Sequence, residues 1–187
     1  NGGVVENVVR GTEAAANAAR ERLERQDLAV ERTERKQSRR HPPPPFTTST
    51  LQQEASRKLG FSAKHTMSVA QRLYEGLDIG GDAGGLITYM RTDSVQIAKE
   101  AVAASRSTIT SEYGNPYLPK TPHAYRSHAK NAQEAHEAIR PTNFKRRPQA
   151  VARSLNPDPA KLYELIWHRA LARQLSSAVL DTVAIDI

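Results

Sequence analysis

Apolar residues in the middle of the chain recur at helical spacing and predict two consecutive helices. The first helix is expected to begin within residues 47–50, where Thr50 and Gln53 have the spacing of a capping box, and to stop at Gly60. Ser62 is expected to cap the second helix. Its apolar face holds Met67, Ala70, Leu73 and Tyr74. Two short helices joined by a tight glycine turn also resemble a helix-turn-helix, although this pattern has low specificity.

Three more helices are predicted from caps, prolines and apolar spacing. The first spans residues 93–112 and is capped by Asp93 or Ser94, and the second spans residues 132–140 and is ended by Pro141. The third spans residues 158–176 and starts at Asp158 and Pro159. Residues 86–90 form a short, apolar, β-prone run. The preceding residues 76–85 hold five of the ten glycines and should form a sharply turning loop.

The two ends of the chain show strand-like patterns. A strand is predicted at residues 4–9, a helix from Thr12 to about Gln26, and a second strand around residues 28–31. A last strand is predicted where Val179, Val183, Ile185 and Ile187 alternate with other residues. The first strand–helix–strand unit has too few large apolar residues to stand alone, so we expect it to belong to a larger sheet. Because the chain starts without a start signal and stops within a strand pattern, we expect it to be a piece of a longer protein.

The predicted fold class is therefore α+β and mainly helical. Four consecutive prolines at residues 42–45 favour an extended linker, or else a ligand for a proline-binding module. We expect three parts: residues 1–46 with a strand, a helix, a strand and the proline linker, residues 47–157 as the main helical domain, and residues 158–187 as a hinge helix with a returning strand.

The basic charge of the chain is concentrated in one stretch. The net charge is +7, and residues 120–153 alone carry 8 Lys or Arg against 2 Asp or Glu. Such a stretch is typical of a phosphate-binding surface, and a solvated basic loop is equally compatible with it. The chain has no cysteine, which excludes disulfides and cysteine-ligated zinc. No apolar run approaches the roughly 20 residues that a membrane-spanning helix needs.

Tyr89 ends the short apolar run at residues 86–90, and Arg91 follows two positions later. If the chain stays extended, the two side chains share a face. A free tyrosine, with a pKa near 10, is a poor nucleophile unless a cation stabilises its phenolate or the transferring phosphoryl group. Arginine can do so with a planar fork that stays charged. By spacing alone, a core tyrosine beside a surface arginine is the simpler interpretation.

His136 and Arg140 are four residues apart, so on a helix they would lie on one face. Together they could grip one phosphate or orient a proton transfer. They could equally form an ordinary helix surface held by Glu137. His136 with Glu137 lacks the two-histidine spacing of a zinc protease, so no metal site is predicted here.

Several long motifs, in order and at the expected separations, closely resemble bacterial type IA DNA topoisomerases. They are PFTTSTLQQ at residues 45–53, MSVAQRLYE at residues 67–75, ITYMRTDS at residues 87–94, QEAHEAIRP at residues 133–141 and LYELIW at residues 162–167. The resemblance covers about residues 45–175 and is highly specific. Residues 1–44 resemble the family only loosely, as the preceding strand–helix–strand of its β-rich arch.

The resemblance implies the following site residues: catalytic Tyr89, Arg91 and His136, and DNA-binding Arg91, Asp93, Lys130, His136 and Arg140. Tyr89 would attack a phosphodiester of single-stranded DNA and hold the 5′-phosphate. The other strand would pass through the gap before the freed 3′-hydroxyl reverses the attack. Arg91 would stabilise the reacting phosphorus centre, and Asp93 would orient His136. The whole cycle would relax negative supercoils without ATP.

Other expectations follow from the same resemblance. Family members hold magnesium in an acidic Toprim domain that nothing in this sequence matches, so the isolated chain should be inactive and should bind no cofactor itself. Its partners would be single-stranded or negatively supercoiled DNA and the remaining domains of the same polypeptide, in the cytoplasm at the nucleoid. The competing hypotheses are a non-catalytic helix-turn-helix DNA-binding module and another tyrosine enzyme, a recombinase or rolling-circle nuclease. Topoisomerase III is not fully separated from topoisomerase I.

Overall fold

The computed structural model describes residues 12–25, 29–77, 84–125 and 137–187. The chain divides into two compact units, one made of residues 1–38 with 179–187 and the other of residues 39–178. The strand predicted at residues 4–9 lies outside the described residues. The boundaries expected at residues 46 and 157 stay a prediction. None of the described helices is long and apolar enough to cross a membrane.

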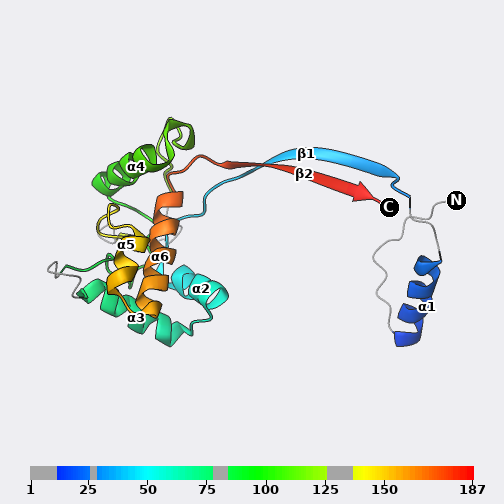
Figure 1. Cartoon of the computed structure of the whole chain (residues 1–187), viewed down its shortest axis with the longest axis horizontal. Helices are drawn as coiled ribbons and strands as arrows, with labels where there is room; N and C mark the ends of the chain where they lie inside the picture. Colours follow the sequence, from blue (N-terminus) through cyan, green and yellow to red (C-terminus); the bar gives the residue numbers. More distant parts are fainter. Residues whose placement is uncertain (1–11, 26–28, 78–83, 126–136) are drawn as a thin grey trace. The chain divides into compact units, whose positions relative to one another are not determined.

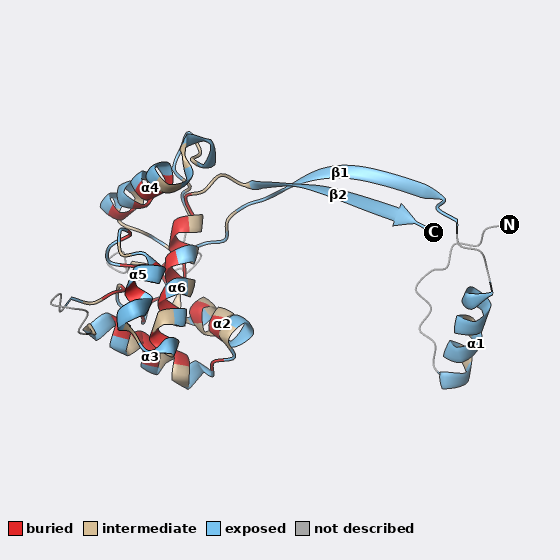
Figure 2. Cartoon of the chain, viewed as in Figure 1, coloured by how far each residue is buried: buried red, intermediate tan, exposed pale blue. Residues whose placement is uncertain are grey.

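The larger unit, residues 39–178, is helical (Figure 1). Its elements are α2 (Thr48–Leu59), α3 (Ala63–Glu75), α4 (Lys99–Tyr113), a 3-10 turn η1 (Asn115–Tyr117), α5 (Pro148–Val151), a 3-10 turn η2 (Ala152–Ser154) and α6 (Pro157–Ala172). Helix α6 is the centre of this unit, since α2, α3, α4 and α5 all pack against it. The buried side chains, red in Figure 2, gather where these helices face α6.

The core of this unit is formed by large apolar side chains from every one of these packed helices and from the Tyr89 segment. The fully buried ones include Phe46, Leu51, Leu73, Leu86, Ile87, Met90, Ile109, Ile139, Leu162, Tyr163 and Ile166. Tyr163 donates its hydroxyl hydrogen to the Arg146 carbonyl at 2.7 Å, and Trp167 donates its indole hydrogen to the Phe144 carbonyl at 3.1 Å. Burial raises the pKa of the Tyr163 phenol, so it stays neutral and serves as a hydrogen-bonded packing residue.

Helix boundaries follow the local sequence closely at α2 and α3. The N-cap of α2 is Thr47, which forms a reciprocal capping box with Thr50, one turn earlier than the predicted pairing of Thr50 with Gln53. Gly60 ends this helix with a φ of 71°, a conformation that glycine adopts without steric cost. Ser62 caps α3 as predicted, accepting the His65 amide hydrogen at 3.1 Å.

The helix predicted at residues 93–112 starts late, which is a correction. Helix α4 begins at Lys99, and its N-cap Ala98 has no side-chain cap of its own. Residues 89–94 are instead non-helical, because hydrogen bonds to Thr48 take up backbone groups of Met90 and Thr92. The predicted cluster of helix amides directly after Asp93 is therefore absent from this described segment.

The helix predicted at residues 132–140 is also wrong over its described part. Residues 137–140 are not helical, and Ile139 forms an antiparallel bridge with Phe46. The Ile139 amide donates to the Phe46 carbonyl at 2.9 Å. Tertiary pairing with this buried neighbour overrides the local helix preference of the alanine- and glutamate-rich sequence. Residues 132–136 lie outside the described residues.

The smaller unit contains α1 (Glu13–Glu24), capped by Thr12 as predicted, and a two-stranded ribbon. Strands β1 (Arg32–Arg40) and β2 (Ala178–Asp186) run in opposite directions (Figure 1). The strand predicted at residues 28–31 is displaced to β1, which is polar throughout and therefore carries no apolar alternation. The β2 prediction is confirmed, and all its residues are exposed.

Candidate active site at Tyr89

Residues 89–94 form neither helix nor strand, the chain bends at Met90, and the burial of the side chains alternates along the segment. Tyr89, Arg91 and Asp93 are exposed, whereas Met90, Thr92 and Ser94 are buried. Tyr89 keeps 43% of its surface exposed, so its interpretation as a core tyrosine is wrong. Because the burial alternates with a period of two residues, as in an extended chain, the phenol, the guanidinium and the carboxylate all lie on the exposed side. This alternation of exposure favours the prediction that Tyr89 and Arg91 share a face.

The Tyr89 ring lies against the end of α3. Its edge meets the ring of Tyr74 with the centroids 5.4 Å apart. Within the described parts of the chain, no hydrogen bond or ion pair is recorded for the Tyr89 hydroxyl, the Arg91 guanidinium or the Asp93 carboxylate. All three groups are therefore free to meet a ligand from solvent.

The first turn of α2 holds the inward side of this segment through one hydroxyl. Thr48 Oγ1 accepts the Thr92 amide hydrogen at 2.8 Å and lies 2.8 Å from the Met90 carbonyl oxygen, to which it donates. The Thr48 amide donates to the Thr92 carbonyl at 2.9 Å. These bonds fix the backbone on both sides of Arg91, so the Arg91 side chain must point outward.

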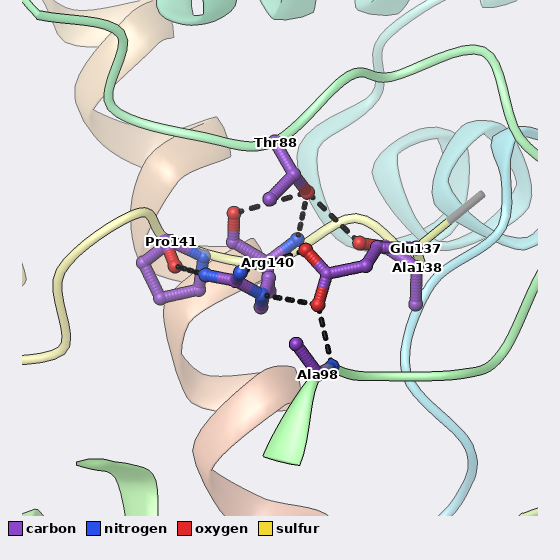
Figure 3. Close-up of polar contacts among 6 residues, drawn as sticks. All are labelled: Thr88, Ala98, Glu137, Ala138, Arg140 and Pro141. Carbon is purple, nitrogen blue, oxygen red and sulfur yellow. Dashed lines mark hydrogen bonds and ion pairs between the residues drawn. The ribbon is translucent and has the colours of Figure 1, made fainter. Parts of the chain in front are cut away.

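A second hydroxyl fixes the residue before Tyr89 (Figure 3). Thr88 Oγ1 donates to the Ala138 carbonyl at 2.8 Å and accepts the Arg140 amide hydrogen at 3.0 Å. The Thr88 amide donates to the Arg140 carbonyl at 2.9 Å, next to the antiparallel bridge between Ile87 and Pro141. The extended segment at residues 138–141 thus runs beside the Tyr89 segment and fixes its position.

Gly85 lets the chain approach α3 directly before these contacts. A β-carbon at Gly85 would overlap the Tyr74 carbonyl oxygen, and the next amide, of Leu86, donates to the Leu73 carbonyl at 2.7 Å. Thr142 Oγ1 donates to the Gly85 carbonyl at 2.7 Å. A residue with no side chain is needed at this point because the backbone of residues 85–86 lies against the end of α3.

Glu137 and Arg140 form a half-buried ion pair that also caps α4, with 30% of the Glu137 side chain exposed (Figure 3). Arg140 Nη2 donates to Glu137 Oε2 at 2.7 Å and Nε donates to Oε1 at 3.2 Å, with 13% of the Arg140 side chain exposed. Glu137 Oε1 accepts the Ala98 amide hydrogen at 2.5 Å. A carboxylate at the start of a helix satisfies its free amides and its positive dipole end.

Arg140 is therefore held by Glu137, as one of the two interpretations of the sequence expected, although residues 137–140 are not helical. Its third donor, Nη1, meets the Pro141 carbonyl at 3.0 Å. The expectation that it holds DNA stays a prediction. His136 and Lys130, the other predicted site residues, lie outside the described residues. Asp93 is exposed beside Arg91, and its contact with His136 is not described.

The residues that hold the site were not singled out from the sequence. Thr48 and Thr88 are among them, and Glu137 was considered only as a partner of a helix surface. The available signal was the Thr-rich run at residues 47–50, which was interpreted only as a set of helix caps. Local spacing cannot show that Thr48 bonds to residues more than forty positions later.

The family model described as "DNA topoisomerase" matches residues 6–187. The chain belongs to the bacterial type IA DNA topoisomerase family.

Curated relatives and a solved structure agree with this assignment. DNA topoisomerase 1 of Rickettsia prowazekii is 53% identical over 94% of this chain and 23% of that protein. DNA topoisomerase 1 of Zymomonas mobilis is 52% identical over 92% of this chain and 13% of that protein. The full-length topoisomerase I structure from Thermotoga maritima superposes with a TM-score of 0.74 at 40% identity, covering 90% of this chain and 26% of that one. The chain thus spans about a quarter or less of the length of these relatives.

Proposed function

We propose that this chain carries the DNA-cleaving tyrosine of a type IA topoisomerase, and that Tyr89 is that residue. The observation that carries the proposal is the shared exposed face of Tyr89, Arg91 and Asp93, held from behind by Thr48 and Thr88. A nucleophile must be accessible and fixed in direction, and this segment meets both requirements. The family membership supports the same assignment.

The proposed reaction is a reversible exchange of two oxygens on phosphorus. The Tyr89 oxygen forms a bond to the phosphorus of a single-stranded DNA phosphodiester, and the bond from phosphorus to the 3′-oxygen breaks. The phenol loses its proton, the 3′-oxygen gains one, and the 5′-phosphate stays on Tyr89. Attack by the 3′-hydroxyl restores the phosphodiester. Because one ester replaces another, no ATP is consumed. In the complete protein, passage of the other strand through the gap relaxes negative supercoils.

Arg91 stabilises the negative charge that develops on the phosphoryl oxygens. Its guanidinium is exposed and has no recorded partner in the described part of the chain, so it can turn toward a phosphate beside Tyr89. His136 with Asp93, and Lys130 with Arg140, are proposed to hold the strand near the reacting phosphate. The strand and the remaining domains of the same polypeptide are the proposed partners, in the cytoplasm at the nucleoid.

Magnesium is expected for the family, but the residues described here do not fit a magnesium site. No three Asp, Glu or His side chains gather in the described ranges in a way that could hold an ion. The chain's own described residues therefore act on the strand through the phenol and the guanidinium, and no step of the proposal passes through a metal that they hold.

The test is the identity of the residue joined to DNA in the complete protein. Cleavage of a single-stranded oligonucleotide is stopped with denaturant, and the attached peptide is identified by mass spectrometry. Tyr89→Phe should abolish the covalent product and plasmid relaxation. Tyr113→Phe is the matched control, because Tyr113 is 44% exposed and also makes an edge-on contact with another tyrosine, Tyr117. DNA attached to another side chain would reject the proposal, as would full relaxation by Tyr89→Phe, which a plain DNA-binding module predicts.

A further inference from the structure

A cavity of about 570 Å³ lies along the first turns of α4, beside residues 122–124 and the end of α6. Tyr89, Arg91 and Asp93 are not among its lining residues. Five of the ten described lining residues are apolar and four are basic or histidine, whereas none of the ten is acidic. They are Ile97, Val102, Ala103, Pro122 and Ala124, then Lys99, Arg106, His123 and Arg173, with Gln96.

Two of these basic side chains contain buried nitrogens without partners. Arg173 is 3% exposed, its Nη2 donates to the His123 carbonyl at 3.3 Å, and its guanidinium lies 5.3 Å from the centre of the Tyr125 ring. Within the described ranges of the chain, its Nε and Nη1 have no hydrogen-bond partner. Arg106 donates from Nη2 to the Pro119 carbonyl at 2.9 Å, and its Nη1 is likewise unpaired.

Buried guanidinium nitrogens without partners are costly, and a native structure normally satisfies them. Burial lowers the pKa of the Arg173 guanidinium, while the nearby Tyr125 phenol opposes this effect. An arginine nevertheless stays charged at neutral pH. The described lining residues include no carboxylate, so an anionic ligand would supply the counter-charge that they lack.

We propose that this cavity binds the phosphate group of a nucleotide, with Arg106 and Arg173 as its main ligands and Lys99 at the rim. The proposal does not depend on the role of Tyr89. Phosphate suits two planar guanidinium forks, which each present parallel donors. The apolar wall and the volume leave room for a sugar and base beside it, since ligand cavities typically measure about 300–1,000 Å³. The unpaired guanidinium nitrogens are buried away from solvent. Phosphate binding therefore includes a rotation of the flexible guanidinium ends toward the ligand.

Calorimetric titration of the whole chain with thymidine 5′-monophosphate, inorganic phosphate and thymidine tests this proposal. All variants carry Arg91→Gln, which removes phosphate binding at the Tyr89 face. The nucleotide should bind more tightly than phosphate, and thymidine should not bind detectably. Arg106→Gln and Arg173→Gln should each weaken nucleotide binding by about tenfold or more, as expected for loss of a charged hydrogen bond. Arg72→Gln is the matched control, because Arg72 is exposed on α3 and away from the cavity lining.

Thermal unfolding separates a lost ligand contact from a lost fold. Without ligand, Arg173→Gln should keep or raise the midpoint, since it removes an unpaired buried charge. With the nucleotide, only the chains with both arginines should gain stability. A 5′-phosphorylated oligothymidine that competes would identify a DNA strand as the phosphate source, and failure to compete would identify a free nucleotide. Any of three results would overturn the proposal. Nucleotide binding could be absent altogether, it could be unchanged in both Arg106→Gln and Arg173→Gln, or Arg72→Gln could reduce it as much as the two cavity variants do.

Discussion

Replacing Thr48 by valine tests whether one hydroxyl fixes the Tyr89 segment. Valine has nearly the same shape and a similar helix propensity, and the N-cap of α2 is the neighbouring Thr47, so the helix itself is little disturbed. The substitution removes the acceptor of the buried Thr92 amide hydrogen and the donor to the Met90 carbonyl, both at 2.8 Å. Thr48→Ser keeps the hydroxyl and is the matched control.

The expected loss follows from these two bonds. One net hydrogen bond contributes about 1 kcal/mol, and an amide left buried without a partner costs a further 1–3 kcal/mol or so. Thr48→Val should therefore lower the free energy of unfolding by about 2–3 kcal/mol, and Thr48→Ser by about 1 kcal/mol or less for the lost methyl group. Urea unfolding of the chain, followed by circular dichroism, measures both values.

Oligonucleotide cleavage by the complete protein supplies the second measurement. Under conditions where both variants are folded, Thr48→Val should slow formation of the covalent product by about tenfold or more, because small displacements of a nucleophile are costly. Thr48→Ser should restore most of the rate. A valine variant that unfolds within about 0.5 kcal/mol of the parent and cleaves at the parent rate would refute the reasoning.

Three other outcomes follow from contacts at the same segment. Gly85→Ala should destabilise the chain by about 2 kcal/mol or more, because its β-carbon overlaps the Tyr74 carbonyl oxygen, and a urea midpoint equal to the parent's would contradict this. Glu137→Gln should cost about 1–2 kcal/mol by leaving the half-buried Arg140 without its counter-charge, whereas exposed Glu100→Gln should change the unfolding free energy by less than about 0.5 kcal/mol. The isolated chain should not relax supercoiled plasmid in magnesium, and clear relaxation would show that the Toprim domain is dispensable.

Much of the helical fold could be predicted from local signals. Gly60, Ser62 and Thr12 mark helix ends where the sequence places them, because capping depends on residues within one turn. Residues 94 and 137–140 show where local signals mislead. Ser94 resembles a helix cap, but the hydrogen bonds from Thr48 to Met90 and Thr92 keep the segment before it non-helical.

The sequence was sufficient to predict the proposed reacting groups of the candidate site, but not the residues that hold them in position. The two-residue spacing of Tyr89 and Arg91 was sufficient to predict a shared face. Thr48, Thr88 and Glu137 act across separations of about forty to fifty residues, and no single-chain pattern encodes such pairing. The position predicted for the strand at residues 28–31 was wrong for a related reason. Strand β1 pairs with β2 without burying either face, so its sequence shows no apolar alternation.

The backbone anchoring of the Tyr89 segment also determines where mechanical load goes. In the proposed covalent complex, tension along the DNA strand attached to Tyr89 would pull on residues 88–92. The hydrogen bonds of residues 88–92 to Thr48 would transmit this force to the first turn of α2, and their hydrogen bonds to residues 138–140 would transmit it to that segment. Helix α2 in turn packs against α6. Tension on such a strand would therefore be distributed over the packed core of the helical unit and not over the Tyr89 segment alone.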